Sequence, residues 1–396
     1  MIVLEYKLAG APRQYAALDE AIRTTQFLRN KCVRQWMDGR GVKPYDLNRS
    51  CAVLAKEYAF ANKLNSQARQ AAAERAGAAI TRFYQNCREK RPGKKGYPQF
   101  QRDCRSVEYK QTGWKLDPGR RAITFTDKIG AGRFTLKGTR DLLAYALETI
   151  KRVRVLRRAD GYYAQFVVEA ERRHDALPSG QAVGIDLGLT RFLTDSAGAV
   201  VANPRPLRRS ERALKRLGRR VASKAKGSAN RGKARNKLAR KHLKITRQRK
   251  DFAVKTARAL VMSNDVIAYE NLRVANLVKN RRLAKSISDA GWRTFIAWLD
   301  YLAHVYGKVA VAVPPAYTSQ DCSRCGARVQ KSLSERTHVC PRCGLILDRD
   351  HNAARNILAL GLRQLEVTTA GHAESHAWGQ SALYSSAATR TSKAAG

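Results

Sequence analysis

The apolar and polar positions of the N-terminal half change their period along the chain, which predicts helices followed by strands. A short alternating stretch at residues 1–8 is typical of a strand, and apolar positions recur at helical spacing from 13 to 38. A second helical tract, rich in Ala and Arg, runs from about 45 to 88. Short alternating stretches between 98 and 172 then predict a β-barrel or sandwich. Residues 1–8 are expected to open this β module, so that the helical segment is an insertion in it.

The C-terminal half intersperses strands with helices. Strands are expected within 182–203 and at 265–270 and 308–313. Helices are expected as a hairpin over 207–262, from Trp292 onward, and from about 350 to 362 after a cysteine-rich segment. The last thirty residues are rich in Ala, Ser and Thr and are expected to be disordered.

Charge changes this picture more than composition does. The 396 residues allow two or three domains, and a hydrophobic content of 44% is ordinary for a folded chain. The formal net charge of +44 is not ordinary, because a fold does not need such an excess and is repelled by it. The charge favours nucleic acid as the partner, with an anionic membrane surface as the alternative. Twenty Lys and Arg residues face a single acid, Glu211, between 205 and 250. This basic hairpin is either a surface for nucleic-acid backbone or a solvated helical face.

Other features of the chain place it in the cytoplasm or on the nucleoid. The sequence has no run of 18 apolar residues that would span a membrane. Its N-terminal apolar stretch is too short for a signal peptide. Eight cysteines in a long chain without a signal do not suggest a disulfide framework.

Two C-x-x-C motifs, CSRCG at 322–326 and CPRCG at 340–344, predict a metal site. Four thiolates at this spacing suit a tetrahedral zinc ion, and a closed shell indicates a structural rather than a catalytic zinc. A redox pair is the alternative. The nearby His338 and His351 are not needed as ligands. The predicted zinc ligands are Cys322, Cys325, Cys340 and Cys343, whereas Cys32, Cys51, Cys87 and Cys104 are expected to pack in the core.

Three acids stand at the ends of predicted elements in a chain poor in acids. Asp186 ends the strand AVGID, Glu270 ends DVIAYE, and Asp350 opens the last helix. Each has a structural interpretation, as a turn residue, an ion-pair partner or a helix cap. If the three converge, they suit hard cations, such as two Mg²⁺ ions about 3.5–4 Å apart that cleave a phosphodiester. Asp348 competes directly with Asp350, and the weaker candidates are Asp195, Asp251 and Asp265.

Taken together, these motifs resemble the TnpB family, the RNA-guided endonucleases of bacterial and archaeal insertion sequences that are related to type V CRISPR effectors. The resemblance rests on VGIDLGLTRFLTDSAG, DVIAYENLRVANLVKN, the two cysteine motifs and LDRDHNAARNIL, which occur in the family's order. SISDAGW, YTSQDCSRCG and AGHAESHAWG add to it. The resemblance covers about 180 to 379, whereas the N-terminal half matches only in the order of its elements and in its pattern of apolar and polar positions.

The resemblance implies a multidomain α+β fold in which a zinc ribbon interrupts an RNase H-like, RuvC-type nuclease domain. Asp186, Glu270 and Asp350 would be its catalytic acids and would hold two Mg²⁺ ions. The implied parts are a wedge-like β-barrel domain at 1–9 and 91–178, a helical recognition-like domain at 10–90, a nuclease domain at 179–318 and 345–366, a zinc ribbon at 319–344 and a disordered tail at 367–396.

The implied function is Mg²⁺-dependent cleavage of double-stranded target DNA, next to a short flanking motif, by a monomer bound to one guide RNA. A small type V CRISPR effector and an RNA-guided regulator that binds without cutting are the alternatives. A DNA-strand transposase is disfavoured because the sequence has no His-x-His motif. Tyr84, Tyr97, Phe100, Tyr109 and Trp114 are either base-stacking or core residues.

Overall fold

The computed structural model describes residues 1–39, 41–174, 176–332 and 334–371. These residues form two compact units, Met1–Arg172 and the described part of the chain from Arg173 onward. Among the described residues, no helix is long and apolar enough to cross a membrane.

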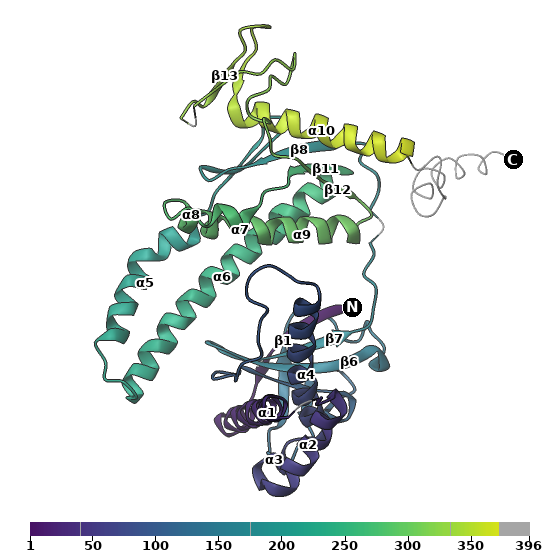
Figure 1. Cartoon of the computed structure of the whole chain (residues 1–396), viewed down its shortest axis with the longest axis vertical. Helices are drawn as coiled ribbons and strands as arrows, with labels where there is room; N and C mark the ends of the chain where they lie inside the picture. Colours follow the sequence, from purple (N-terminus) through teal and green to yellow (C-terminus); the bar gives the residue numbers. More distant parts are fainter. Residues whose placement is uncertain (40, 175, 333, 372–396) are drawn as a thin grey trace, which may run out of the picture. The chain divides into compact units, whose positions relative to one another are not determined.

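The first unit is built on a seven-stranded sheet with the strand order β2-β6-β7-β1-β5-β4-β3 (Figure 1). Its strands are β1 (Ile2–Ala9), β2 (Ser106–Tyr109), β3 (Trp114–Leu116), β4 (Ala122–Phe125), β5 (Gly132–Lys137), β6 (Ile150–Arg158) and β7 (Gly161–Val168). Its helices are α1 (Pro12–Asp38), α2 (Pro44–Glu57), α3 (Ala59–Lys63) and α4 (Ser66–Arg88). Strand β1 pairs antiparallel with both β5 and β7, which confirms that residues 1–8 belong to the β module. The four helices follow β1 as an insertion.

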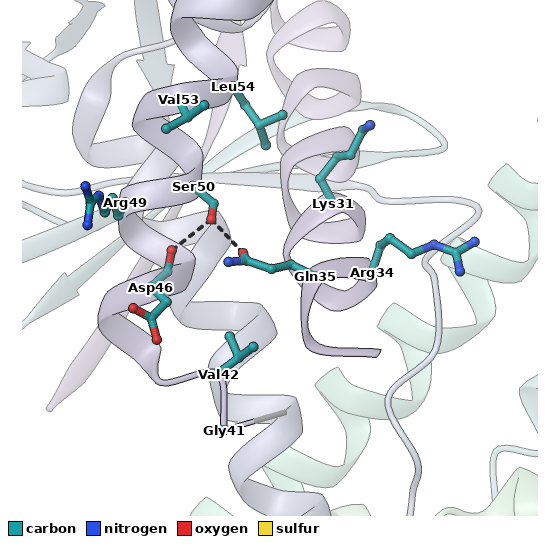
Figure 2. Close-up of a pocket in the computed structure, with 10 residues that line it drawn as sticks. All are labelled: Lys31, Arg34, Gln35, Gly41, Val42, Asp46, Arg49, Ser50, Val53 and Leu54. Carbon is teal, nitrogen blue, oxygen red and sulfur yellow. Dashed lines mark hydrogen bonds between the residues drawn. The ribbon is translucent and has the colours of Figure 1, made fainter. Parts of the chain in front are cut away.

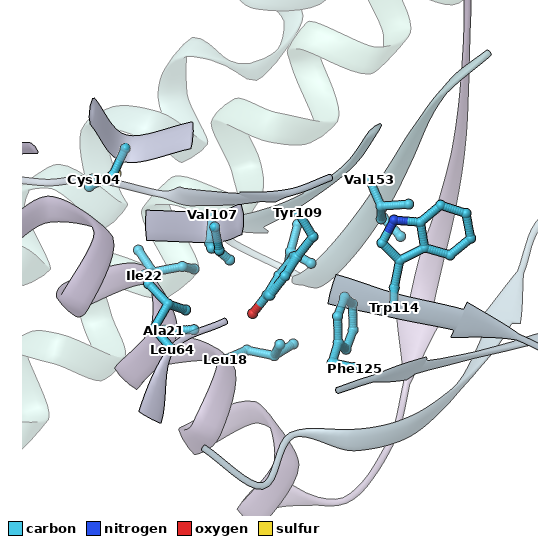
Figure 3. Packing of buried hydrophobic residues seen from close by; sticks show 14 of the residues in the cluster. Leu18, Ala21, Ile22, Leu64, Cys104, Val107, Tyr109, Trp114, Phe125 and Val153 are labelled. Atoms are coloured by element: carbon cyan, nitrogen blue, oxygen red, sulfur yellow. The ribbon is translucent and has the colours of Figure 1, made fainter. Parts of the chain in front are cut away.

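The core of this unit lies between the sheet and the helices. Alternate residues of β1 are buried, and they share one hydrophobic cluster with Leu18 and Ile22 of α1. Figure 3 shows Tyr109 and Trp114 among the buried side chains of this cluster, and the Tyr109 ring contacts that of Phe125. Tyr109 is fully buried and donates a hydrogen bond to Asp127 at 2.7 Å. Tyr109 and Trp114 are therefore core residues, and base stacking by them is ruled out.

The second unit is built on a five-stranded sheet with the order β10-β9-β8-β11-β12. Its strands are β8 (Ala182–Leu187), β9 (Arg191–Asp195), β10 (Val200–Ala202), β11 (Val266–Glu270) and β12 (Val309–Val313). Strand β9 runs antiparallel to both β8 and β10, whereas β8, β11 and β12 are parallel to one another. This arrangement agrees with the predicted RNase H-like fold.

Helices cover both faces of this sheet, as Figure 1 shows. They are α5 (Pro206–Ala222), α6 (Ala229–Ser263), α7 (Val274–Leu277), α8 (Ala284–Ala290), α9 (Trp292–Val305) and α10 (Arg349–Gly371). Helices α6 and α9 pack on one face and α10 packs on the other. A small hairpin of β13 (Thr337–Val339) and β14 (Ile346–Asp348) lies between β12 and α10 in the chain. Helix α10 continues five residues into the expected tail, and the rest of that tail lies outside the described residues.

A buried ion-pair network links two strands of the first sheet. The Glu108 side chain on β2 is 5% exposed and accepts hydrogen bonds from Arg152 and Arg154 of β6, both at 2.8 Å. Burial alone would raise the pKa of Glu108, but the hydrogen bonds and charges of the two arginines lower it overall.

This lowered pKa predicts acid-sensitive stability. A carboxyl whose folded pKa lies below its unfolded value of about 4.3 stabilises the fold above that pH and loses the contribution as pH falls further. We expect Glu108→Gln to lower the free energy of unfolding by about 1–3 kcal/mol at pH 7. In urea unfolding of the full chain, the gap between the parent and the variant should shrink below pH 4. If the difference in unfolding free energy between parent and variant were the same at pH 7 and below pH 4, Glu108 would not have the lowered pKa.

Candidate active site and metal centre

Two of the three candidate acids stand at the ends of adjacent parallel strands. Strand β11 pairs with β8 up to Tyr269 and Ile185, so Glu270 and Asp186 are the next residue on each strand. Neighbours in register on parallel strands point to the same face of a sheet. Glu270 is 8% exposed, whereas Asp186 is intermediate in exposure. The sheet therefore brings these two carboxylates together from positions far apart in the sequence.

The third acid, Asp350, lies on helix α10, which packs against the face of β8 that carries Asp186. A Cβ added at Gly184, two residues before Asp186, would lie 2.2 Å from the carbonyl oxygen of Ala354 in α10. A Cβ at Gly361 would lie 2.5 Å from Ala268 of β11. A side chain at either position would clash, so the two glycines allow the helix to approach the sheet closely. Its first turn, which carries Asp350, is held near the ends of β8 and β11.

Asp348 has a different role from Asp350. Its Oδ1 accepts the backbone N–H groups of Asp350 and His351 at 2.9 and 3.3 Å, which is the pattern of a helix N-cap. Its Oδ2 accepts from Arg191 at 3.0 Å. Asp348 therefore caps α10 and pairs with an arginine, and the carboxylate of Asp350 is not needed as the cap.

The charges of Glu270 and Asp350 affect the ionisation of Asp186. Burial, followed by the nearby charges of Glu270 and Asp350, raises the pKa of Asp186 to about 8. Burial also raises the pKa of Glu270, against a hydrogen bond from Thr318 that lowers it. Carboxylates that disfavour one another's charge in this way form a site that a cation would stabilise. Among the described residues, the four cysteines are the one group of three or more potential metal ligands whose donor atoms all lie within 4.8 Å of one another. The carboxylate oxygens of the three acids do not all lie within this distance of one another.

The four cysteines form a compact cluster that could hold a metal ion. The sulfur atoms of Cys322 and Cys343 lie 3.6 Å apart, as do those of Cys325 and Cys340. Tetrahedral zinc with bonds of about 2.3 Å needs sulfur atoms about 3.8 Å apart, so the residues present fit this ion. Burial opposes ionisation of Cys340, but backbone N–H groups and neighbouring thiols lower its pKa to about 6, which favours the thiolate that zinc binds.

Glycines shape both knuckles of this centre. Gly326 and Gly344 have φ values of +73° and +72°, in the left-handed region that side chains disfavour. Their N–H groups bond back to the carbonyl oxygens of Cys322 and Cys340 at 2.9 Å. Of the other cysteines, Cys32, Cys51 and Cys104 are buried as expected, but the prediction that Cys87 packs in the core is wrong because it is exposed.

The weaker acidic candidates have structural partners. Burial alone would raise the pKa of Asp265, but hydrogen bonds from Lys308 and two backbone N–H groups hold it at about 2. Asp195 accepts the N–H groups of Ala197 and Ala199 in a turn. Asp251 is exposed and pairs with a lysine one helical turn away. Each of the three therefore has a structural partner, and they remain the weaker candidates.

The basic segment forms the expected hairpin of α5 and α6, and one buried acid anchors it. The side chain of Asp289 on α8 is 5% exposed and accepts the N–H groups of Leu207 and Arg208 at 2.9 and 3.0 Å. These N–H groups open α5, so the carboxylate caps this helix from a distant element. The sequence suggested no role for Asp289, although it lies in the quoted motif SISDAGW.

A cavity of about 600 Å³ lies between α1 and α2 (Figure 2). Lys31, Arg34 and Arg49 stand around it, and Ser50 donates a hydrogen bond to Gln35 at 2.6 Å in its wall. Elsewhere in the first unit, on α4 and in the loop that follows it, aromatic rings are open to solvent. Tyr84 and Tyr97 are 57% and 54% exposed, and both rings contact Trp36. Unlike Tyr109, these two tyrosines are accessible to a base.

Comparison with known proteins agrees with the geometry. A family model described as a probable transposase (OrfB_IS605) matches residues 165–281, and one described as Cas12f1-like, TNB domain, matches residues 292–357. The fold is similar to that in the "Cas12f1-sgRNA-target DNA complex", with a TM-score of 0.52 and 14% identity, over 87% of this chain and 81% of that one. The second unit thus has an RNase H-like fold with a four-cysteine segment inserted before its last helix.

Sequence relatives define the family. A "Putative RNA-guided DNA endonuclease" of Streptomyces pristinaespiralis is 45% identical over 183 residues, 46% of this chain and 45% of the relative, so the match spans less than half of that protein. The "Putative RNA-guided DNA endonuclease InsQ" of Escherichia coli (strain K12) is 30% identical over 299 residues, 71% of this chain and 72% of the relative. The chain belongs to the TnpB family, as its motifs predict.

The close approach of α10 to β8 gives a testable prediction. Gly184→Ala places a Cβ against helix backbone that cannot move aside alone, and we expect it to lower the free energy of unfolding by about 3 kcal/mol. The matched control is Gly218→Ala on α5, where a Cβ meets nothing within 4 Å, and a gain of about 0.5–1 kcal/mol is expected. Chemical unfolding of both variants checks this, and equal stabilities would refute the packing argument.

The cysteine centre predicts one zinc ion per chain. We expect Cys343→Ala to lose this zinc in elemental analysis and to become protease-sensitive across the ribbon, because a three-thiolate shell binds zinc more weakly. Cys87→Ala is the matched control, since this exposed cysteine lies outside the cluster, and it should retain the zinc. Full zinc content in the Cys343 variant would show that the four thiolates are not the ligands.

Proposed function

We propose that this protein is an RNA-guided DNA endonuclease whose catalytic residues are Asp186, Glu270 and Asp350. The observation that supports the proposal is the placement of these acids at the ends of the adjacent strands β8 and β11 and in the first turn of α10, which packs on β8. The pKa of Asp186, raised by burial and by the other two carboxylates, supports it. The names of the sequence relatives supply the substrate class.

The donor set of the site suits Mg²⁺. Carboxylate oxygens are the ligands that this hard cation takes, and the pKa of Asp186 is raised by burial and by the charges of the other two carboxylates, which a bound cation would offset. A pair of Mg²⁺ ions held there would activate a water and offset the charge on the leaving 3′ oxygen of a phosphodiester. Asp186, Glu270 and Asp350 would hold the ions, and the cap formed by Asp348 keeps the Asp350 side chain available.

The excess of positive charge supports two nucleic-acid partners, a structured guide RNA and double-stranded target DNA. A heteroduplex is bound through its backbone and shape rather than its sequence, which requires many Lys and Arg side chains and few base-specific contacts. The basic hairpin of 205–250 suits such a backbone. The cavity between α1 and α2 and the exposed Tyr84 lie in the segment that we assign as recognition-like, 10–90, and the exposed Tyr97 lies just after it, in the wedge-like segment.

We retain the remaining domain assignments as part of this proposal. Residues 1–9 and 91–178 form the wedge-like domain, 179–318 and 345–366 the nuclease domain, and 319–344 the ribbon. The zinc ion is structural, since four thiolates fill its shell. The protein acts as a monomer on one RNA in the cytoplasm or on the nucleoid.

Two alternatives differ from the proposal by observable features. A regulator that binds DNA without cutting would not need three converging acids, all of which are present here. A small type V CRISPR effector would share the chemistry, and its gene would neighbour a CRISPR array rather than transposon ends. Sequencing the RNA that copurifies with the protein separates these origins, because a guide extending past a transposon boundary favours the proposal.

Cleavage by the purified RNA complex tests the catalytic assignment. We expect Asp186→Ala to lower Mg²⁺-dependent cleavage of target DNA by at least about 10³-fold, because it removes a ligand shared by the reaction centre. The matched control is Asp251→Asn, which changes an exposed acid of the same unit and should cut like the parent. Parental cleavage by the Asp186 variant would show that the assignment is wrong.

A further inference from the structure

A buried threonine contacts one of the candidate catalytic acids. The Thr318 hydroxyl donates a hydrogen bond to Oε1 of Glu270 at 2.5 Å. Thr318 is 5% exposed and Glu270 is 8% exposed, so water has little access to this bond. Among the described residues, this hydroxyl is the one hydrogen-bond donor to the Glu270 carboxylate. The contact therefore places a hydroxyl directly on one oxygen of the carboxylate that the proposed function assigns to the cation.

Thr318 is itself held in place by helix α10. The Asn356 side-chain amide donates to the carbonyl oxygens of Thr318 and Asp321 at 2.8 and 2.6 Å. One turn earlier, the fully buried Asn352 donates to the same Asp321 oxygen at 2.8 Å and accepts the N–H of Ser323 at 2.9 Å. The two asparagines thus clasp the segment 318–323, where the zinc ribbon begins.

This arrangement links two candidate acids through one helix. Helix α10 carries Asp350 in its first turn and, through Asn356, fixes the backbone of the residue that contacts Glu270. A hydrogen bond to Oε1 restricts rotation of the Glu270 carboxylate and leaves Oε2 for a cation. Hydrogen-bond partners of metal ligands commonly change metal affinity by about 10–100-fold.

We propose that Thr318 is a positioning residue that orients the Glu270 carboxylate for the catalytic cation. The inference rests on the proposed function only in taking Glu270 as a ligand of that cation. A hydroxyl with a purely structural role would change stability when removed and would leave cation affinity unaltered. A positioning hydroxyl changes cation affinity even in a variant that is fully folded.

The test is binding of Mn²⁺ to the full chain, measured by electron paramagnetic resonance, with Asp186→Ala used to identify the signal from this site. Two pairs of proteins isolate the hydroxyl: the parent against Thr318→Val, and Thr318→Ser against Thr318→Ala. We expect Val and Ala to weaken Mn²⁺ binding roughly tenfold, and Ser to bind like the parent. The Ser and Ala pair adds no bulk, so it keeps the test informative if the valine variant does not fold.

Tyr269→Phe is the matched control. It removes one hydroxyl, which bonds Asp300 at 2.9 Å, from the residue next to Glu270 on the same strand. Because successive strand residues face opposite ways, the Tyr269 hydroxyl does not contact the carboxylate, and Mn²⁺ affinity should not change. Zinc content should remain at the parental value in every variant.

Equal Mn²⁺ affinity in the parent and Thr318→Val, or in Thr318→Ser and Thr318→Ala, would overturn the inference. So would weakening by Tyr269→Phe to the same extent, which would indicate a general response to lost hydroxyls. The Mn²⁺-binding test of Thr318 can be distinguished from the DNA-cleavage test of the proposed function. A protein that binds Mn²⁺ with the expected dependence on Thr318, but never cuts DNA, would refute the endonuclease and leave the role of Thr318 intact.

Discussion

The close packing of one helix against one strand determines the candidate active site. Gly184 lets the backbone of α10 approach β8 to a distance that no side chain would allow. Asp186 follows two residues later on the same face, and Asp350 lies in the first turn of the helix. The positions of the two carboxylates therefore depend on a glycine that has no chemistry of its own. The repulsion between the acids disfavours this arrangement in the absence of a cation, and the packing maintains it.

The cysteine ribbon is held to helix α10 by hydrogen bonds. It lies in the chain between β12 and α10, and Asn352 and Asn356 of α10 clasp its first residues. Thr318, at the start of this segment, contacts Glu270. A metal centre that is closed to substrate is thus connected by hydrogen bonds to the elements that carry two of the three acids. Under the proposed function, a zinc ion at the cysteines would have no chemical role and would act only by holding the elements that carry the acids.

Much of the fold could be predicted from the sequence, because strands and helices differ in period and the cysteine spacing is specific. The three candidate acids were identifiable because each ends or opens an element. The division of roles between Asp348 and Asp350 was not, since it depends on the residue at which α10 begins. Thr318 lies in a loop whose sequence shows no partner, and burial alone separates Tyr109 from the exposed Tyr84. Such features depend on tertiary contacts that periodicity does not encode.

The most direct test of the central claim is to locate bound Mn²⁺ by anomalous diffraction from crystals of the full chain. If three acids converge into one cation site, the anomalous peaks will lie among the carboxylates of Asp186, Glu270 and Asp350. They will be absent in the Asp186→Ala variant, while the zinc peak at the four cysteines remains in both proteins. Mn²⁺ bound elsewhere, or peaks unchanged in the variant, would contradict the account.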